Sequence, residues 1–261
     1  MPSRRLPNSI PAVLRTLKTA RDTYKNTPVP ADRALSAEQF ALLTDTGTPP
    51  SFLTRFEKEC ADVDIAQAAQ APLTTDLAQK AARLTTFVSH FHQVLDFGIT
   101  RGAFRTGARS YYGRDITATD LPDLSSYDAV QEAAEKVGTG EAARATAEGT
   151  GFVPMSNPSA AEVAAILAEF RTARAASQSA IARTDREREE AGALYPDAQV
   201  LAVDLCDTVE FFYRRDPDGG SRRTKCARWG VVYLYEPNET PDPGTGTGGS
   251  GGGSSPNPAV G

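Results

Sequence analysis

Arginine is concentrated in one short segment near the end of this acidic chain. Between residues 214 and 228 the basic side chains outnumber the two acidic ones, Asp216 and Asp218. Guanidinium groups recognise phosphate and carboxylate through paired hydrogen bonds. We therefore treat this segment as a candidate anion site, with these members: Arg214, Arg222, Arg223 and Arg228.

A second set of arginines lies in the segment RGAFRTGARSYYG at residues 101–113 and comprises Arg101, Arg105 and Arg109. Aromatic side chains that can stack on a base lie near the two sets: Tyr111, Tyr112 and Trp229. In the simpler interpretation, the arginines pair with the chain's many carboxylates and with the carbonyl groups at helix C-termini. The sequence leaves both interpretations open.

The two histidines, His90 and His92, do not form a metal site together. Residues two apart on a helix point to nearly opposite sides, so the two imidazoles cannot share an ion. A di-metal carboxylate site in a helical bundle needs Glu-x-x-His on two helices, and the sequence lacks this pattern. We expect structural roles for both histidines, with a contact between His92 and Asp96 one helical turn later.

The other chemistry-bearing motifs are missing. Three cysteines without a C-x-x-C pair argue against a disulfide framework or a structural zinc site. Cys206 lies on or near the apolar stripe of a helix, where a packed thiol is expected rather than a nucleophile. Haem-attachment, dinucleotide-binding, phosphate-loop and nucleophile-elbow motifs do not occur in the right context. We predict no catalytic residue, no metal and no cofactor.

Composition limits the class of protein. The 261 residues are 40% hydrophobic and 23% charged, which is typical of a soluble globular protein. The net charge of −5 argues against non-specific binding of nucleic acid by the whole molecule. No segment approaches the roughly 20 apolar residues that span a bilayer. We expect no membrane association and, without a secretory signal, a cytoplasmic location.

Helical periodicity dominates residues 1–235 and defines the elements that must position these side chains. Helices are predicted in the following segments: 9–25, a capped turn at 36–39, 52–71, 76–102, 126–137, 159–189 and 197–213. Breaks are predicted at 72–75 and at 190–196, where prolines occur. Only residues 229–235 have the pattern of a strand, and this strand has no predicted partner.

Two stretches, about residues 50–113 and 158–230, repeat one order of features. Each has a Pro-Ser pair, two amphipathic helices around a central break, and an arginine- and glycine-containing loop. Phe56 in the first aligns with Phe170 in the second. Identity is low and helical stripes align easily by chance, so internal duplication and coincidence are both consistent with the pattern.

A short break between two amphipathic helices favours an antiparallel hairpin, and two hairpins bury their stripes as a four-helix bundle. We therefore predict an all-α fold over residues 1–235: an antiparallel four-helix bundle with peripheral short helices and one short C-terminal strand. Phe91 and Phe170 are expected in its core. Residues 236–261 are rich in Gly, Ser and Pro and are predicted to form a flexible tail.

The segments SHFHQVLDFGITRG (89–102) and VEFFYRRDPDGGSRRTKCARWGVVY (209–233) carry a family resemblance. The chain resembles a group of uncharacterised bacterial hypothetical proteins with similar S-H-F-x-Q-V and V-E-F-F-Y runs. The resemblance spans about residues 6–235. It implies one folded unit and adds no chemistry.

We therefore predict a non-enzymatic interaction protein, either a self-assembling subunit or an adaptor for a protein partner. The alternative is an anion- or nucleic-acid-binding module that uses the arginine segments. The alternative predicts binding to an oligonucleotide that weakens steeply with salt.

Overall fold

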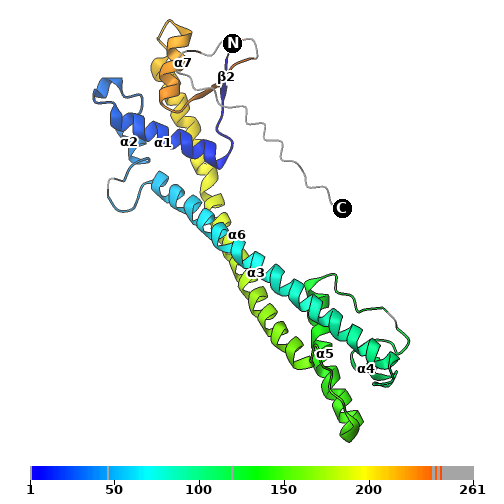
Figure 1. Cartoon of the computed structure of the whole chain (residues 1–261). Coiled ribbons are helices and arrows are strands. Elements are labelled where there is room, and N and C mark those ends of the chain that lie inside the picture. The colour runs from blue at the N-terminus through cyan, green and yellow to red at the C-terminus, as the bar shows by residue number, and fades with distance from the viewer. Residues whose placement is uncertain (1, 46, 119, 237–238, 240–241, 243–261) are drawn as a thin grey trace. The chain divides into compact units, whose positions relative to one another are not determined.

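The computed structural model of the chain describes residues 2–45, 47–118, 120–236, 239 and 242. These residues are mostly helical and contain one antiparallel pair of short strands (Figure 1). The predicted helical class is therefore confirmed. The chain divides into two compact units. Unit 1 is Met1–Val63 with Glu187–Gly261, and unit 2 is Asp64–Arg186.

The helices and strands follow one another in this order: β1 (Ser3–Arg5), α1 (Ile10–Asn26), η1 (Pro30–Asp32), α2 (Ala37–Ala41), α3 (Phe52–Thr100), α4 (Ala108–Tyr111), α5 (Tyr127–Glu148), η2 (Gly149–Gly151), α6 (Ala160–Tyr213), α7 (Gly219–Arg228) and β2 (Val232–Leu234). The predicted α1 and the predicted capped turn at α2 are confirmed. At α2, Ser36 and Gln39 make both reciprocal bonds of a capping box.

The two predicted helix breaks are wrong. α3 continues through Pro72 and α6 continues through Pro196. A proline inside a helix removes one backbone hydrogen bond and costs about 3 kcal/mol or more. Both prolines are exposed, so water can solvate the carbonyl groups that they leave unpaired. Each predicted hairpin is instead one continuous helix, and neither the four-helix bundle nor the duplication is confirmed.

Three further features of the secondary structure differ from the prediction. α5 runs through Gly138 and Gly140, which were expected to end it. The arginine-rich segment after α6 contains a helix, α7, where a loop was expected. Finally, β2 has a partner, because β1 pairs with it in an antiparallel register.

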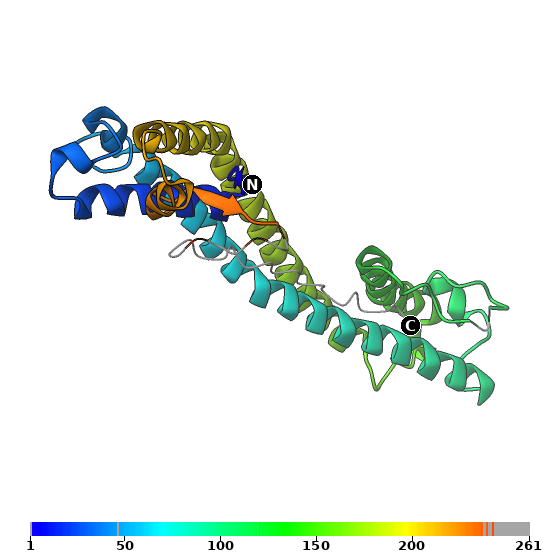
Figure 2. The same ribbon diagram turned by 90° about the horizontal axis from the view of Figure 1, so that it is seen from above.

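The core of unit 1 joins α1, the first turns of α3 and the last part of α6. Its largest fully buried side chains include Leu17, Phe56 and Leu205. Figure 2 shows the strand β2 (orange) beside α7, and α7 also contacts α1. The turn before β2 needs Gly230, because a Cβ there would lie 3.0 Å from the backbone oxygen of Thr16. This close approach holds the turn before β2 against α1.

The core of unit 2 joins parts of α3, α5 and α6. Phe91 and Phe170 are both fully buried in it, as predicted. α4 packs directly on α5 in Figure 1. At this contact a Cβ on Gly140 would lie 2.5 Å from the backbone oxygen of Tyr111. Unit 2 is therefore held together by close backbone contact as well as by apolar side chains.

The predicted flexible tail at 236–261 falls almost wholly outside the described residues, apart from positions 236, 239 and 242. Among the helices that are described, none has the length and apolar character needed to cross a membrane.

Candidate anion-binding site

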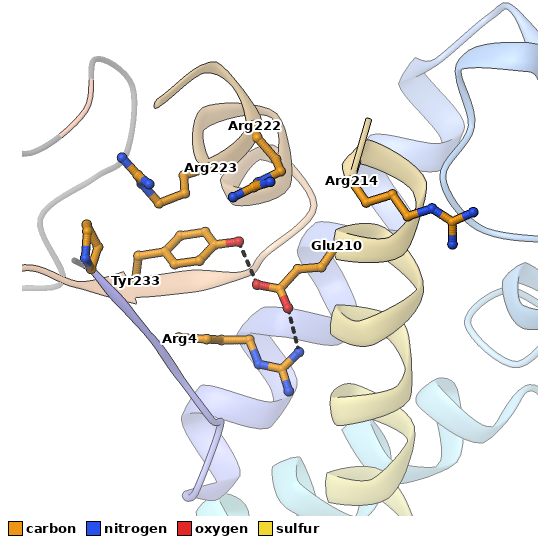
Figure 3. Close-up of a pocket in the computed structure, with 7 residues that line it drawn as sticks. Arg4, Glu210, Arg214, Arg222, Arg223 and Tyr233 are labelled. Atoms are coloured by element: carbon orange, nitrogen blue, oxygen red, sulfur yellow. Dashed lines mark hydrogen bonds and ion pairs between the residues drawn. The ribbon is translucent and has the colours of Figure 1, made fainter. Parts of the chain in front are cut away.

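The site in unit 1 begins at the strand pair. Arg4 of β1 lies opposite Tyr233 of β2, and directly opposed side chains share one face of a sheet. On this face both side chains contact Glu210 of α6 (Figure 3). The Tyr233 hydroxyl donates to Glu210 Oε1 at 2.7 Å, and Arg4 Nη1 donates to Oε2 at 3.0 Å. The strand pair thus fixes a guanidinium and a phenol around one carboxylate.

The helix α7 supplies the arginines on the other side of the site. Asp218 caps this helix, since its carboxylate accepts hydrogen bonds from the backbone N–H groups of Gly220 and Ser221 at 3.1 and 3.0 Å. Such a cap satisfies N–H groups that the first turn leaves unpaired. The capped helix carries Arg222 and Arg223 to the rim of the site.

A cavity of about 320 Å³ lies between these elements and is lined by Pro2, Arg4, Glu210, Arg214, Arg222, Arg223 and Tyr233. In Figure 3 the guanidinium of Arg222 points toward the hydroxyl of Tyr233 and the carboxylate of Glu210. The guanidinium groups of Arg214 and Arg223 point away from it. Arg222 makes no side-chain hydrogen bond or ion pair with any described residue. We call this cavity the anion site.

Two of the other arginines that line the cavity, Arg223 and Arg4, are already paired. Arg223 donates to both carboxylate oxygens of Asp242, at 2.6 and 3.2 Å, and this contact lowers the pKa of Asp242. Arg4 pairs with Asp207 as well as with Glu210, and both bonds use Nη1 alone. The charge of Arg222 is therefore the one left without a described counter-ion inside the cavity.

The Tyr233 phenol and two nearby thiols are held in their protonated form. Burial and the hydrogen bond to Glu210 raise the pKa of Tyr233, so its hydroxyl stays a donor. Burial raises the pKa of the Cys226 thiol, and it raises the pKa of the Cys206 thiol to about 12. Cys206 is buried in the unit 1 core, as predicted for a packed thiol. Neither thiol has the environment of an activated nucleophile.

The predicted arginines are divided between the two units. Arg214, Arg222 and Arg223 line the anion site in unit 1. Arg228 lies exposed on α7, the helix of Arg222 and Arg223, and does not line the site. The other set belongs to unit 2. There Arg101 and Arg105 are exposed, and Arg109 Nε donates to Asp96 at 2.7 Å.

Two of the three predicted stacking residues are buried. Tyr112 is 2% exposed and donates a hydrogen bond to Glu141. Trp229 is 3% exposed, and its Nε1 donates to the Tyr213 hydroxyl at 3.2 Å. Neither ring has a free face for a ligand. Tyr111 is half-buried.

The exposed aromatic side chains are different ones. Phe211 and Phe212 at the end of α6 are 64% and 41% exposed. The guanidinium carbon of Arg214 lies 3.5 Å from the centre of the Phe211 ring. These three residues, with Ala34, Thr208 and Arg215, line a second cavity of about 310 Å³. We call this second surface the aromatic surface.

The two histidines were predicted to point to nearly opposite sides of one helix, and the structure buries His92 and leaves His90 exposed. The expected contact between His92 and Asp96 is wrong. Neither ring nitrogen of His92 has a hydrogen-bond partner, and the Asp96 carboxylate instead accepts from Arg109 and Arg114. Burial and the charge of Arg114 lower the pKa of His92 to about 4, so the imidazole is neutral near pH 7.

One acidic cluster lies elsewhere in unit 1. Ligand-type oxygens of Glu59, Asp62 and Glu187 all lie within 4.8 Å of one another. The Lys58 ammonium donates to Glu59 at 3.2 Å and to Asp62 at 2.8 Å. Since a cation already neutralises part of this cluster, its geometry points to surface ion pairing.

Sequence reasoning missed Arg4, Glu210 and Tyr233, which organise the anion site. The one signal for them was the strand pattern around Tyr233, because a strand requires a partner and the partner carries Arg4. No family model, curated protein or solved structure matches this chain.

Proposed function

We propose that this chain is a non-enzymatic interaction protein whose anion site binds a carboxylate or phosphate group of its partner. The observation that carries the proposal is the guanidinium of Arg222, which points into the cavity without a described counter-ion. A guanidinium presents several N–H donors in a fixed plane and matches the oxygens of both anions. A bound anion would supply the counter-charge that Arg222 lacks.

Glu210 supports this function although it is itself an anion. It accepts one hydrogen bond from the Tyr233 hydroxyl and one from Arg4 Nη1, so the remaining N–H donors of the Arg4 guanidinium are fixed before a ligand arrives. Fixed donors lose less conformational entropy on binding. The carboxylate also limits the positive charge of the site, which favours a singly or doubly charged group over a dense polyanion.

The experiment is a titration of the ¹⁵N-labelled chain with inorganic phosphate at low salt, followed by NMR. We expect saturable shifts in the Arg222 Nε–H resonance and in the backbone resonances of α7. Arg222→Gln should abolish the saturable shifts on α7. Arg228→Gln is the matched control, because Arg228 is exposed on the same helix and lies outside the cavity. Equal shifts in both variants, or no saturation, would refute the proposal.

The partner that we propose is a protein, either another protein or a second copy of this chain. The exposed rings of Phe211 and Phe212 support a protein partner, since exposed aromatic clusters mark interaction surfaces. Light scattering during size exclusion tests self-association directly. A mass above 27.8 kDa that falls to the monomer value in Phe211→Ser would favour self-assembly, and a monomer would favour a separate partner. A cytoplasmic location stays a prediction.

A further inference from the structure

The anion site and the aromatic surface are neighbours at the end of α6. Arg214 lines both cavities. Its backbone lies beside the anion site, while its guanidinium turns away from that site and stacks on Phe211 (Figure 3). A ligand at one cavity is therefore adjacent to the other.

The aromatic surface combines apolar area with positive charge. Phe211 is the most exposed large apolar side chain among the described residues. Arg214 and Arg215 are exposed and make no ion pair with a described residue. An occupant of this surface must cover the aromatic rings and must bring negative charge, because otherwise it would place two unpaired cations beside a buried apolar contact.

We infer that the partner presents an acidic peptide segment, with a carboxylate in the anion site and a nearby apolar side chain on the aromatic surface. This inference rests on the proposed function and names the chemistry of the partner. The carboxylate accepts paired hydrogen bonds from Arg222, and the apolar side chain covers Phe211 and Phe212. Further acidic residues of the segment face Arg214 and Arg215.

The charges around the two cavities favour a peptide over a nucleic acid. The whole chain has a net charge of −5, which repels a polyanion at long range. Within the site, Glu210 lies on the cavity wall and Asp207 is bonded to Arg4. Phosphates repeated along a strand would meet these carboxylates, whereas a peptide can place one acidic group at Arg222 and neutral atoms beside Glu210.

The test is selection from a random peptide library displayed on phage, with the full chain as bait. Peptides that also bind the double variant Arg222→Gln/Phe211→Ser are removed by counter-selection. We expect the enriched peptides to share an acidic residue and a nearby aromatic or large aliphatic residue. The dissociation constant of one enriched, fluorescein-labelled peptide is then measured for each single variant by anisotropy.

We expect Arg222→Gln and Phe211→Ser each to weaken the peptide by about tenfold or more, as for central contacts of an interface. Phe97→Ser is the matched control, since Phe97 is 61% exposed and belongs to unit 2. It should leave the dissociation constant within about twofold. Far-UV circular dichroism confirms that the variants fold, which is expected because none of the three side chains is buried.

Three results would overturn the inference: no enriched peptide, enriched peptides without an acidic residue, or equal binding to Phe211→Ser.

Binding of fluorescein-labelled oligothymidine tests for a nucleic-acid partner. If it binds and dissociates steeply between about 50 and 200 mM salt, the partner is a nucleic acid. The phosphate titration separates the two proposals. If phosphate still saturates Arg222 in wild type and in Phe211→Ser, the anion site stands and only the peptide is refuted.

Discussion

Arg144 in unit 2 and Arg222 in unit 1 have opposite environments. In unit 2, Arg144 is fully buried, with its guanidinium carbon 4.8 Å from the ring centres of both Phe104 and Phe152. In unit 1, Arg214 and Arg222 lie at or near the surface without a described counter-ion. Burying a charge is costly unless the charge is paired, so the buried arginine is a structural residue. An arginine at the surface without a counter-ion is available to a ligand.

The partners of Arg144 show how unit 2 satisfies a buried charge. Its Nη2 donates to the backbone oxygen of Val153 at 2.8 Å and to the carboxylate of Glu141 at 3.3 Å. The same carboxylate accepts from the backbone N–H of Met155 at 2.7 Å and from the Tyr112 hydroxyl. The ion pair therefore joins α5 to α4 and to the segment after η2.

The largest expected effect comes from breaking this buried pair. Arg144→Met should lower the free energy of unfolding by about 3 to 5 kcal/mol, because the half-buried Glu141 carboxylate loses its counter-ion. Urea denaturation measures the change. Arg215→Met is the control, and at this exposed position we expect a change within about 0.5 kcal/mol. If both variants lost the same free energy of unfolding, the contrast between the buried and the exposed arginine would be wrong.

The second effect concerns pH and the buried His92. Its pKa is about 4 in the folded protein and about 6.5 in an unfolded chain, so the unfolded state takes up the proton first. As the pH falls from about 6.5 to about 4, this group should lower the free energy of unfolding by up to about 3 kcal/mol. Above pH 6.5 the imidazole is neutral in both states, so it does not make the free energy of unfolding depend on pH.

Comparison of two leucine variants isolates this group from the carboxylates that titrate in the same range. His92→Leu should remove its contribution, and it loses no hydrogen bond because neither ring nitrogen has a partner. His90→Leu, at the exposed position, should keep the full pH dependence. The comparison uses urea denaturation at several pH values. If the free energy of unfolding of His92→Leu kept the pH dependence of the wild type, the assignment of this effect to His92 would be wrong.

A third, smaller effect tests the contact that holds Tyr112 near Arg144. Gly140→Ala should destabilise the protein by about 1 to 3 kcal/mol, because its Cβ would lie 2.5 Å from the backbone oxygen of Tyr111. Gly138→Ala on the same helix meets nothing within 4 Å and should stabilise it by up to about 1 kcal/mol. Thermal denaturation of the two variants should shift in opposite directions.

The smallest effect on stability is expected at Arg222 in unit 1. Arg222→Gln removes no described hydrogen bond or ion pair and should change the free energy of unfolding by less than about 0.5 kcal/mol. Phosphate binding should nevertheless be lost. A destabilisation as large as that of Arg144→Met would show that Arg222 is a structural residue too.

Much of the helical architecture could be predicted from the sequence. Apolar spacing placed Phe91 and Phe170 in the core, and the Ser36–Gln39 capping box located α2. The helix breaks predicted at Pro72 and Pro196 are wrong, because the rule that proline ends a helix considers only the residues around the proline. It does not include the stability of the helical turns on either side. Exposed prolines inside long helices lose one bond each, and the rest of each helix keeps its hydrogen bonds.

Only half of the anion site could be predicted. Arg222 was found because arginines cluster visibly in α7, although that helix has only one buried residue, Cys226, and so shows no apolar stripe. Arg4 was invisible because β1 is a three-residue polar segment whose partner lies at the far end of the described chain. Contacts of such long sequence separation leave no periodic signal. The carboxylate of Glu210 that joins the two strands was missed for the same reason.

The pairing of β1 with β2 also sets an order of events during synthesis on the ribosome. Unit 2 is continuous in the chain, so all of it emerges before the second part of unit 1. Arg4 precedes its strand partner Tyr233 by 229 residues (233 − 4), a delay of roughly 11 to 46 s at about 5 to 20 residues per second. The nascent chain must keep its first strand unpaired for that time. Ligand binding at the anion site is thus among the last properties that a newly made molecule acquires.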